Sequence, residues 1–189
     1  MTTATTPRTD RPRRGLRAVV GATVLAVGLT GCFPDPGLPP TVGAAITVSK
    51  TVGIQPGDVI TVSGTGFTPT GNIGTRPPLG GAPAGVYVVF GRFAEVWKPS
   101  AGAGGRTVLL QKWALPQSSI DTLVAFPWNQ DPAEFVTIGA DGSWTAQITV
   151  PAFDPAGGGY GFAVYPGSGA SNAGEELLER VAVAAPVPT

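Results

Sequence analysis

The segment 144–150 alternates without a break between apolar and polar side chains. Its apolar members are Trp144, Ala146, Ile148 and Val150. Because successive side chains of a β-strand point to opposite faces of a sheet, this pattern predicts a strand with one face in a core and the other in water. The pair Asp141-Gly142 just before it favours a tight turn. We therefore expect a β-hairpin whose other strand lies in the preceding segment 135–138.

Several other short segments have strand character. Ile46 and Val48 alternate with polar residues, as do Ile60 and Val62, and turn-forming residues separate the two pairs. The segment 85–90 is apolar on both faces, which is typical of a central strand. Strands at 160–165 and 177–183 bring the count to about seven.

This pattern predicts an all-β fold, an immunoglobulin-like two-sheet sandwich over residues 44–184 with a long insert after the third strand and a flexible tail at 185–189. The composition agrees, because 28 glycines and 20 prolines among 189 residues favour turns and short strands over helices.

The first 31 residues have the three parts of an export signal. An arginine-rich start is followed by an apolar run at 18–29 and then by small residues before Cys32, the only cysteine in the chain. A transmembrane helix needs about 20 apolar residues, so the run is too short for one. Residues 32–43 are proline-rich and predict a stiff, extended linker.

The stretch Leu29-Thr30-Gly31-Cys32 resembles the lipobox of bacterial lipoproteins. The resemblance implies that the Cys32 sulfur carries diacylglycerol, with palmitate-like chains, and that the chain is cut just before it. It also implies acylation of the new amine. Two or more fatty chains anchor a protein stably, whereas one binds a membrane only marginally. We therefore expect a lipid-anchored protein on the extracellular face of the cell membrane.

Other interpretations of this signal stay open. A plain secretory signal with a cysteine near its cut site would give a freely secreted protein, and an uncleaved signal would itself be the anchor. The pair Arg13-Arg14 also leaves both the general and the twin-arginine export routes open.

The segments ITVSKTVGIQPGDVITVSGTGFTPT and ADGSWTAQITV resemble the opening strands and central hairpin of actinobacterial neocarzinostatin-type domains. The later YGFAVYPGSGASNAGEE is similar to the penultimate strand and loop of related envelope proteins. The resemblance implies an immunoglobulin-like domain in the cell envelope. The chain departs from the secreted members in having no paired cysteines, so it gains no disulfide stabilisation.

Charge and residue types exclude several functions. From Cys32 onward seven basic residues face eleven acidic ones, a net charge of −4, so no basic stripe predicts binding to nucleic acid. The chain has no histidine, which removes the commonest general base and metal ligand. We expect no enzymatic activity, no cofactor and no metal.

The segment between Phe90 and Phe135 is expected as the insert, because its alternation is weak and a loop of this length must pack against something. Its candidate binding residues are Arg92, Trp97, Trp113 and Trp128. Tryptophans are flat anchors for ligands, and arginine adds charge recognition. The alternative, which we favour for most of the rings, is that they form a satellite core. Val108 to Leu110, with Trp113 and Leu115, is interpreted as buried strand or turn.

The acidic residues allow two interpretations. Asp131 and Glu134 near Trp128 would suit glycosidase-like chemistry if their spacing were right, but solvated surface acids are the preferred interpretation. Glu175, Glu176 and Glu179 are expected at the start of a solvent-facing strand or in one helical turn.

We expect a membrane-anchored exported lipoprotein that acts as a non-catalytic binding or interaction module at the cell envelope. An envelope protein or a small molecule is the expected partner, and loops at the ends of the sandwich are the expected sites. The alternatives are a structural envelope protein without a discrete ligand and a freely secreted small-molecule-binding protein of the neocarzinostatin-like type.

Overall fold

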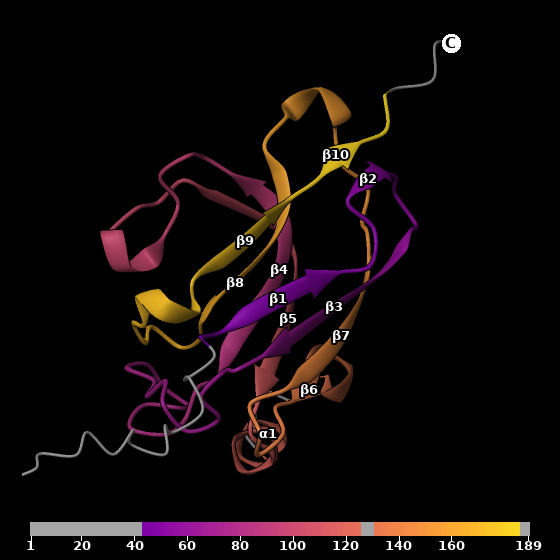
Figure 1. The fold of residues 1–189 in the computed structure, drawn as a ribbon. Coiled ribbons are helices and arrows are strands. Elements are labelled where there is room, and N and C mark those ends of the chain that lie inside the picture. The colour runs from indigo at the N-terminus through magenta and orange to yellow at the C-terminus, as the bar shows by residue number, and fades with distance from the viewer. Residues whose placement is uncertain (1–42, 126–130, 186–189) are drawn as a thin grey trace, which may run out of the picture. The chain divides into compact units, whose positions relative to one another are not determined.

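The computed structural model describes residues 43–125 and 131–185, all within the unit Leu38–Thr189 (Figure 1). Two main sheets form a sandwich. The first has the order β1(Ala45–Val48), β3(Val59–Thr65), β7(Trp144–Thr149). The second has the order β6(Phe135–Thr137), β5(Arg106–Leu115), β4(Val86–Phe93), β8(Tyr160–Pro166), β9(Leu177–Arg180). A small sheet pairs β10(Ala182–Val183) with β2(Val52–Ile54).

Helices are few among the described residues. One α-helix, α1(Gln117–Val124), follows β5, and four 3₁₀ turns lie in loops: η1(Pro99–Ala101), η2(Pro132–Glu134), η3(Pro155–Gly157) and η4(Ala173–Glu175). No helix in the described part of the chain has the length and apolar character needed to cross a bilayer. The all-β prediction is confirmed as a two-sheet sandwich. The expected signal, residues 32–42 of the expected linker with Cys32, and residues 186–189 of the expected tail lie outside the described residues.

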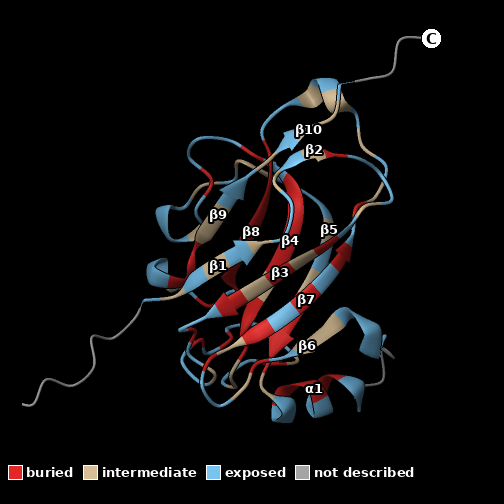
Figure 2. Ribbon diagram, turned by 45° about the vertical axis from the view of Figure 1, so that its right-hand side comes forward, coloured by how far each residue is buried: buried red, intermediate tan, exposed pale blue. Residues whose placement is uncertain are grey.

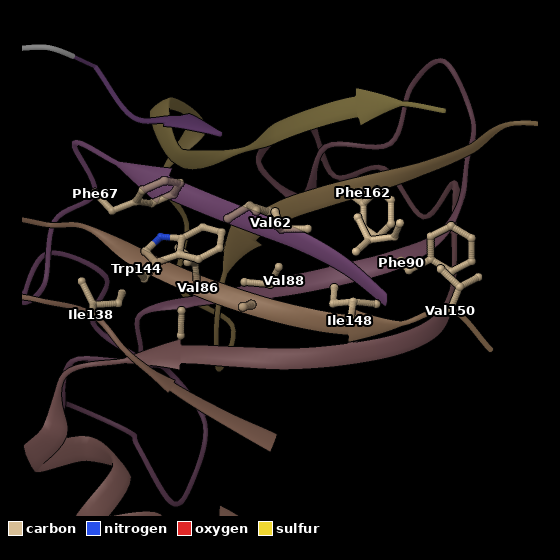
Figure 3. Packing of buried hydrophobic residues seen from close by; sticks show 14 of the residues in the cluster. Val62, Phe67, Val86, Val88, Phe90, Ile138, Trp144, Ile148, Val150 and Phe162 are labelled. Atoms are coloured by element: carbon tan, nitrogen blue, oxygen red, sulfur yellow. The ribbon is translucent and has the colours of Figure 1, made fainter. Parts of the chain in front are cut away.

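The main core lies between the two large sheets. Buried side chains of β3 and β7 meet those of β4, β5 and β8, and Figure 3 shows Val62 and Ile148 in this layer with Val88 and Phe162. The alternation predicted for segment 144–150 is confirmed, since its apolar side chains are buried and its polar ones exposed. β3 behaves in the same way, with Ile60 and Val62 in the core.

The Trp144 indole lies close against the backbone of β3. A Cβ atom at Gly64 would come within 2.2 Å of the ring, so only glycine leaves room for it. The indole nitrogen is buried and has no hydrogen-bond acceptor among the described residues. Its ring meets Phe67 edge-on at 5.3 Å, and Figure 3 shows the nitrogen on the side of the indole nearer Phe67.

The inner strands β4 and β8 of the five-stranded sheet are buried on both faces. β4 and β8 are red along most of their length in Figure 2, and every residue of β8 is buried. Val88 and Phe90 face the main core, whereas Val89 and Phe93 belong to a cluster on the outer face with Trp97. The prediction that segment 85–90 is a central strand is confirmed, because β5 and β8 flank it.

The expected hairpin around Asp141-Gly142 is wrong. The turn itself forms, with Gly142 at φ +76° and the Asp141 carboxylate accepting bonds from the Ser143 amide and hydroxyl. Its two flanking strands, however, belong to different sheets: β7 pairs with β3, and β6 pairs in parallel with β5. A parallel neighbour needs a crossover, which the segment containing α1 supplies.

The structure also differs from the expected long insert at 90–135. Arg106 to Leu115 forms β5, the longest strand, which pairs with β4 from end to end through a bulge next to Gly91. Segment 177–183 likewise forms two strands, because Arg180 ends β9 and Ala182 begins β10 in the small sheet.

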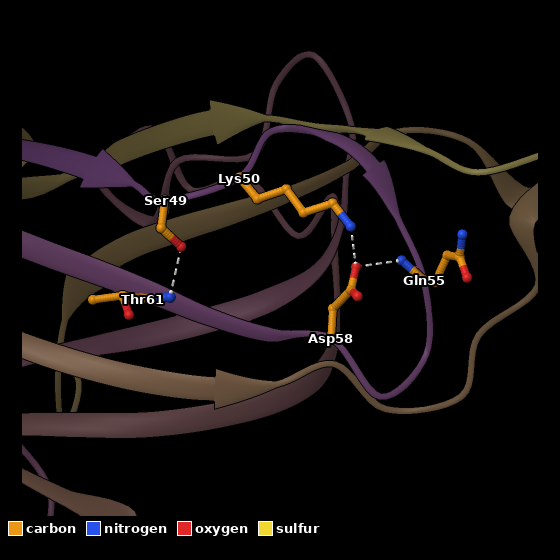
Figure 4. A network of polar contacts seen from close by, with 5 residues as sticks. All are labelled: Ser49, Lys50, Gln55, Asp58 and Thr61. Atoms are coloured by element: carbon orange, nitrogen blue, oxygen red, sulfur yellow. Dashed lines mark hydrogen bonds and ion pairs between the residues drawn. The ribbon is translucent and has the colours of Figure 1, made fainter.

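The turn between β2 and β3 is held by one carboxylate (Figure 4). Asp58 accepts from the Lys50 ammonium at 2.7 Å and from the Gln55 amide at 2.9 Å. These contacts hold the pKa of the Asp58 carboxyl below its usual value, with the Lys50 hydrogen bond as the main cause. The Ser49 hydroxyl accepts from the Thr61 amide and ties β3 to the end of β1.

Candidate ligand pocket on the outer face of the five-stranded sheet

Three loops border a cavity of about 390 Å³ on the outer face of the five-stranded sheet. They are the loop before β4, the loop from β4 to β5, and the loop after β8, and Figure 1 shows all three at the same side of the sandwich. The strands supply the floor. We call this cavity the arginine–tyrosine pocket, after Arg76, Tyr87, Arg106 and Tyr165 in its lining.

Two tyrosines form the floor because β4 and β8 are in register. Tyr87 of β4 is directly opposite Tyr165 of β8, and their rings meet edge-on at 5.7 Å. The Tyr87 hydroxyl accepts from the Ser168 amide at 3.1 Å, which leaves its own proton able to donate elsewhere. Burial raises the pKa of the Tyr165 phenol, and the Arg106 guanidinium opposes this shift only in part. Tyr165 is therefore a neutral hydrogen-bond donor at ordinary pH.

Arg106 begins β5 and is held in place along one edge. Its Nη1 donates to the carbonyls of Trp97 and Ala103, the latter at 2.7 Å. The guanidinium carbon lies 5.2 Å from the centre of the Tyr165 ring, in cation–π range. Nε and Nη2 are left without a carboxylate partner among the described residues. This second edge of the guanidinium has the parallel N–H pair that matches an oxyanion.

Arg76 reaches the pocket from the opposite loop. Its side chain is exposed and makes no hydrogen bond or ion pair with the described residues. Its backbone is fixed, because the Arg76 carbonyl accepts from the buried Ser168 hydroxyl at 2.8 Å. The side chain of Thr75 donates to the same loop after β8. An exposed cation on an anchored loop therefore lines the same pocket as Arg106.

Two buried carboxylates tie the three loops together. Glu175 is 3% exposed and accepts from the Thr68 amide at 2.8 Å and the Asn72 side chain at 2.6 Å. Glu176 is 1% exposed and accepts from the amide and hydroxyl of Ser100 at 2.8 and 2.6 Å. Each carboxylate is thus occupied away from the arginines.

This arrangement corrects the expectation for the acidic cluster. Glu175 ends the 3₁₀ turn η4 and Glu176 follows it, but both are buried, and only Glu179 is exposed as expected. The hydrogen-bond donors that offset the cost of burying these two carboxylates come from residues far away in the sequence, so no local sequence pattern reveals them.

The charge of the pocket is one-sided. None of the described residues that line it is acidic, and the ion pair found in the described part of the chain joins Lys50 to Asp58 at a different loop. The rest of the lining consists of Ser171, two prolines, two alanines and two glycines. The pocket therefore offers positive charge on its rim and aromatic and aliphatic surface below.

Two of the three tryptophans named from the sequence, Trp97 and Trp113, lie in satellite cores. Trp97 is 5% exposed and packs on Phe93 at 5.5 Å and on Tyr165 at 6.4 Å. Trp113 is 9% exposed, packs on Tyr87 at 4.9 Å, and donates from Nε1 to the Ala84 carbonyl at 2.7 Å. Both rings support the pocket tyrosines from the side rather than facing a ligand. Trp128 lies outside the described residues.

Arg92 is not brought together with these rings. Its guanidinium donates to the carbonyls of Gly157 and Gly158 and lies 6.0 Å from the Tyr160 ring. It borders a cavity of about 500 Å³ in which five of the ten lining residues are glycines. Arg106 also lines this cavity, but half of the lining residues have no side chain, so it offers fewer groups that could select a ligand than the arginine–tyrosine pocket does.

The acidic pair Asp131 and Glu134 has a local role. Asp131 caps the 3₁₀ turn η2 by accepting from the Ala133 amide at 2.9 Å, and both residues are exposed. No group of three or more His, Cys, Asp or Glu side chains in the described residues is placed to hold a metal ion.

The sequence did not single out Arg76, Arg106, Tyr87 or Tyr165. One signal was present, since Tyr87 and Tyr165 each add a hydroxyl to a strand that is mostly apolar. Comparisons of this chain with protein-family models, with curated proteins and with solved structures find no match.

Proposed function

We propose that this chain is an exported lipoprotein whose sandwich acts as a non-catalytic binding module on the extracellular face of a cell membrane. The observation that carries the binding role is the arginine–tyrosine pocket, where backbone carbonyls hold Arg106 and its guanidinium pairs with no carboxylate among the described residues. A guanidinium fixed in advance loses little freedom when it binds. Cys32 and its lipobox-like context carry the proposed anchor.

A binding role fits the chemistry of this pocket better than catalysis. Its titratable side chains are two arginines and two tyrosines, and the pKa of Tyr165 is raised. Neither type readily exchanges a proton near neutral pH, whereas general acid–base catalysis needs a group whose pKa lies near the working pH. A cavity of about 390 Å³ is within the size range of small-molecule sites.

The finer classification belongs to the same proposal. We assign the sandwich to the immunoglobulin-like type and the protein to the actinobacterial envelope on the resemblances given above. Trp97 and Trp113 are buried, which favours a structural role for these two rings and says nothing of the role of the whole protein. The freely secreted alternative is separated from the anchored protein by the chemistry of Cys32.

The anchor is tested by mass spectrometry of the mature protein isolated from its own membranes. We expect an N-terminal Cys32 that carries a diacylglycerol mass and an amide-linked acyl mass. The variant Cys32→Ser should lose both masses and leave the membrane fraction. Release of the intact wild-type protein into the medium, with no acyl mass on the sulfur, would contradict the anchored form and favour the secreted one.

A further inference from the structure

We propose that the arginine–tyrosine pocket binds a small organic oxyanion, a carboxylate or phosphate carried on a flat apolar group. The inference rests on the proposed binding function and names its ligand class. Three features of the pocket carry it: unpaired positive charge, hydroxyl donors, and apolar walls.

The positive charge is the first feature. Arg76 and Arg106 both line the pocket, and neither pairs with a carboxylate among the described residues. The nearby carboxylates of Glu175 and Glu176 accept hydrogen bonds from Thr68, Asn72 and Ser100 instead of pairing with the arginines. No carboxylate in the lining therefore competes with an anion for the two guanidiniums. The Nε and Nη2 edge of Arg106, which has no carboxylate partner among the described residues, has the geometry for two parallel hydrogen bonds to one oxyanion.

Donor hydroxyls are the second feature. The phenol of Tyr165 stays protonated because burial raises its pKa. Tyr87 accepts from the Ser168 amide, so its own proton is available for an acceptor on the ligand. Ser171 adds a further hydroxyl to the lining. A pocket that presents mainly donors selects an acceptor-rich group over an amine or ammonium.

The walls decide the rest of the ligand. Pro99 and Ala103 come from the loop between β4 and β5, Pro166 and Ala170 from the end of β8 and the loop after it, and all four line the pocket together with the two tyrosines. The apolar part of a ligand that packs against these surfaces is removed from water, which favours binding. Inorganic phosphate or acetate would pair with the arginines but leave the apolar walls exposed to water. An oxyanion with an attached ring would cover these walls as well, so it is the better fit.

The test is calorimetric titration of the intact, lipidated protein in detergent with four probes: benzoate, phenyl phosphate, acetate, and the neutral isostere benzamide. We expect benzoate or phenyl phosphate to bind with Kd in about the millimolar range, as their few atoms allow. Acetate and benzamide should bind at least about fivefold more weakly. The stronger of the first two identifies the oxyanion.

Matched variants separate the pocket from general charge. Arg76→Gln should weaken binding by at least about fivefold, and its fold should be intact because the Arg76 side chain bonds to nothing in the described residues. Lys98→Gln removes the same charge from an exposed site on the loop between β4 and β5, outside the lining, and should change binding by less than about twofold. Arg106→Lys keeps the positive charge but removes the parallel N–H donors of the guanidinium, so it should also weaken binding.

The inference is overturned if benzamide binds as well as benzoate, if Arg76→Gln and Lys98→Gln behave alike, or if no probe binds at concentrations well above the expected Kd. Equal binding of benzamide would leave a binding module with a neutral ligand. None of these results bears on the acyl mass of Cys32, so the membrane anchor is tested independently of the ligand.

Discussion

At the scale of single residues, the buried carboxylate of Glu176 is a sharp test of the loop architecture. It accepts two hydrogen bonds from Ser100 and is almost completely excluded from solvent. Replacing it with alanine removes both bonds and leaves a gap, so we expect Glu176→Ala to lower the free energy of unfolding by about 2–3 kcal/mol. Chemical denaturation measures the loss.

Glu179 supplies the control for that substitution. It is exposed and lies three residues along the chain, so Glu179→Ala should change stability by no more than about 0.5 kcal/mol. Equal effects of the two variants would mean that the two glutamates are equally solvated, as the sequence alone predicts.

Asp58 makes stability depend on pH at the acidic end. Lys50 and the Gln55 amide lower the folded-state pKa of Asp58 below 3.8, the value expected in the unfolded chain. A lowered pKa contributes stability that is present above the unfolded value and lost as pH falls through the folded one. We expect Asp58→Asn to reduce Tm at pH 7, and the difference from wild type to vanish at about pH 2. A difference that persists unchanged at acid pH would contradict this role.

At the scale of elements, the close approach of β3 and β7 depends on Gly64. The Trp144 ring occupies the place of a Cβ atom there, with the nearest ring carbon 2.2 Å away. Gly64→Ala forces the indole out of its contact with Phe67, so we expect a loss of about 1–3 kcal/mol in thermal or denaturant unfolding. Gly104→Ala, where nothing lies within 4 Å, should be nearly neutral. Similar losses in both would argue against this packing.

The strands that could be predicted from the sequence are those with one clear environment. β3 and β7 have one buried and one exposed face, and β4 is buried on both, so each produces a simple pattern. β5 has no such pattern. Its Val108 and Leu109 are exposed where β6 does not reach, while Trp113 and Leu115 are buried against the segment containing α1.

The pocket could not be predicted because its parts are joined by register and by long-range bonds. The pairing of Tyr87 with Tyr165 follows from the alignment of β4 with β8, and the bond from Asn72 to Glu175 spans 103 residues. The tryptophans were the visible aromatic signal, but a large ring in a small sandwich is most readily used to fill the core. Arg106 becomes a candidate only when its carbonyl partners are known.

At the scale of the whole molecule, stability comes from burial and hydrogen bonding without an intrachain disulfide, since the chain has one cysteine. Thermal unfolding should therefore give the same Tm with and without dithiothreitol. A marked fall in Tm on reduction would point to a disulfide between two copies through Cys32, and would leave that sulfur unavailable for a lipid.

The position of a bound ligand on the sandwich is measured directly by intermolecular nuclear Overhauser effects from benzoate. We expect contacts from the benzoate ring to the ring protons of Tyr87 and Tyr165, and their loss in Arg76→Gln. Contacts confined to another cavity, such as the apolar one of about 250 Å³ beside Ile54 and Phe153, would contradict the assignment of the arginine–tyrosine pocket as the binding site.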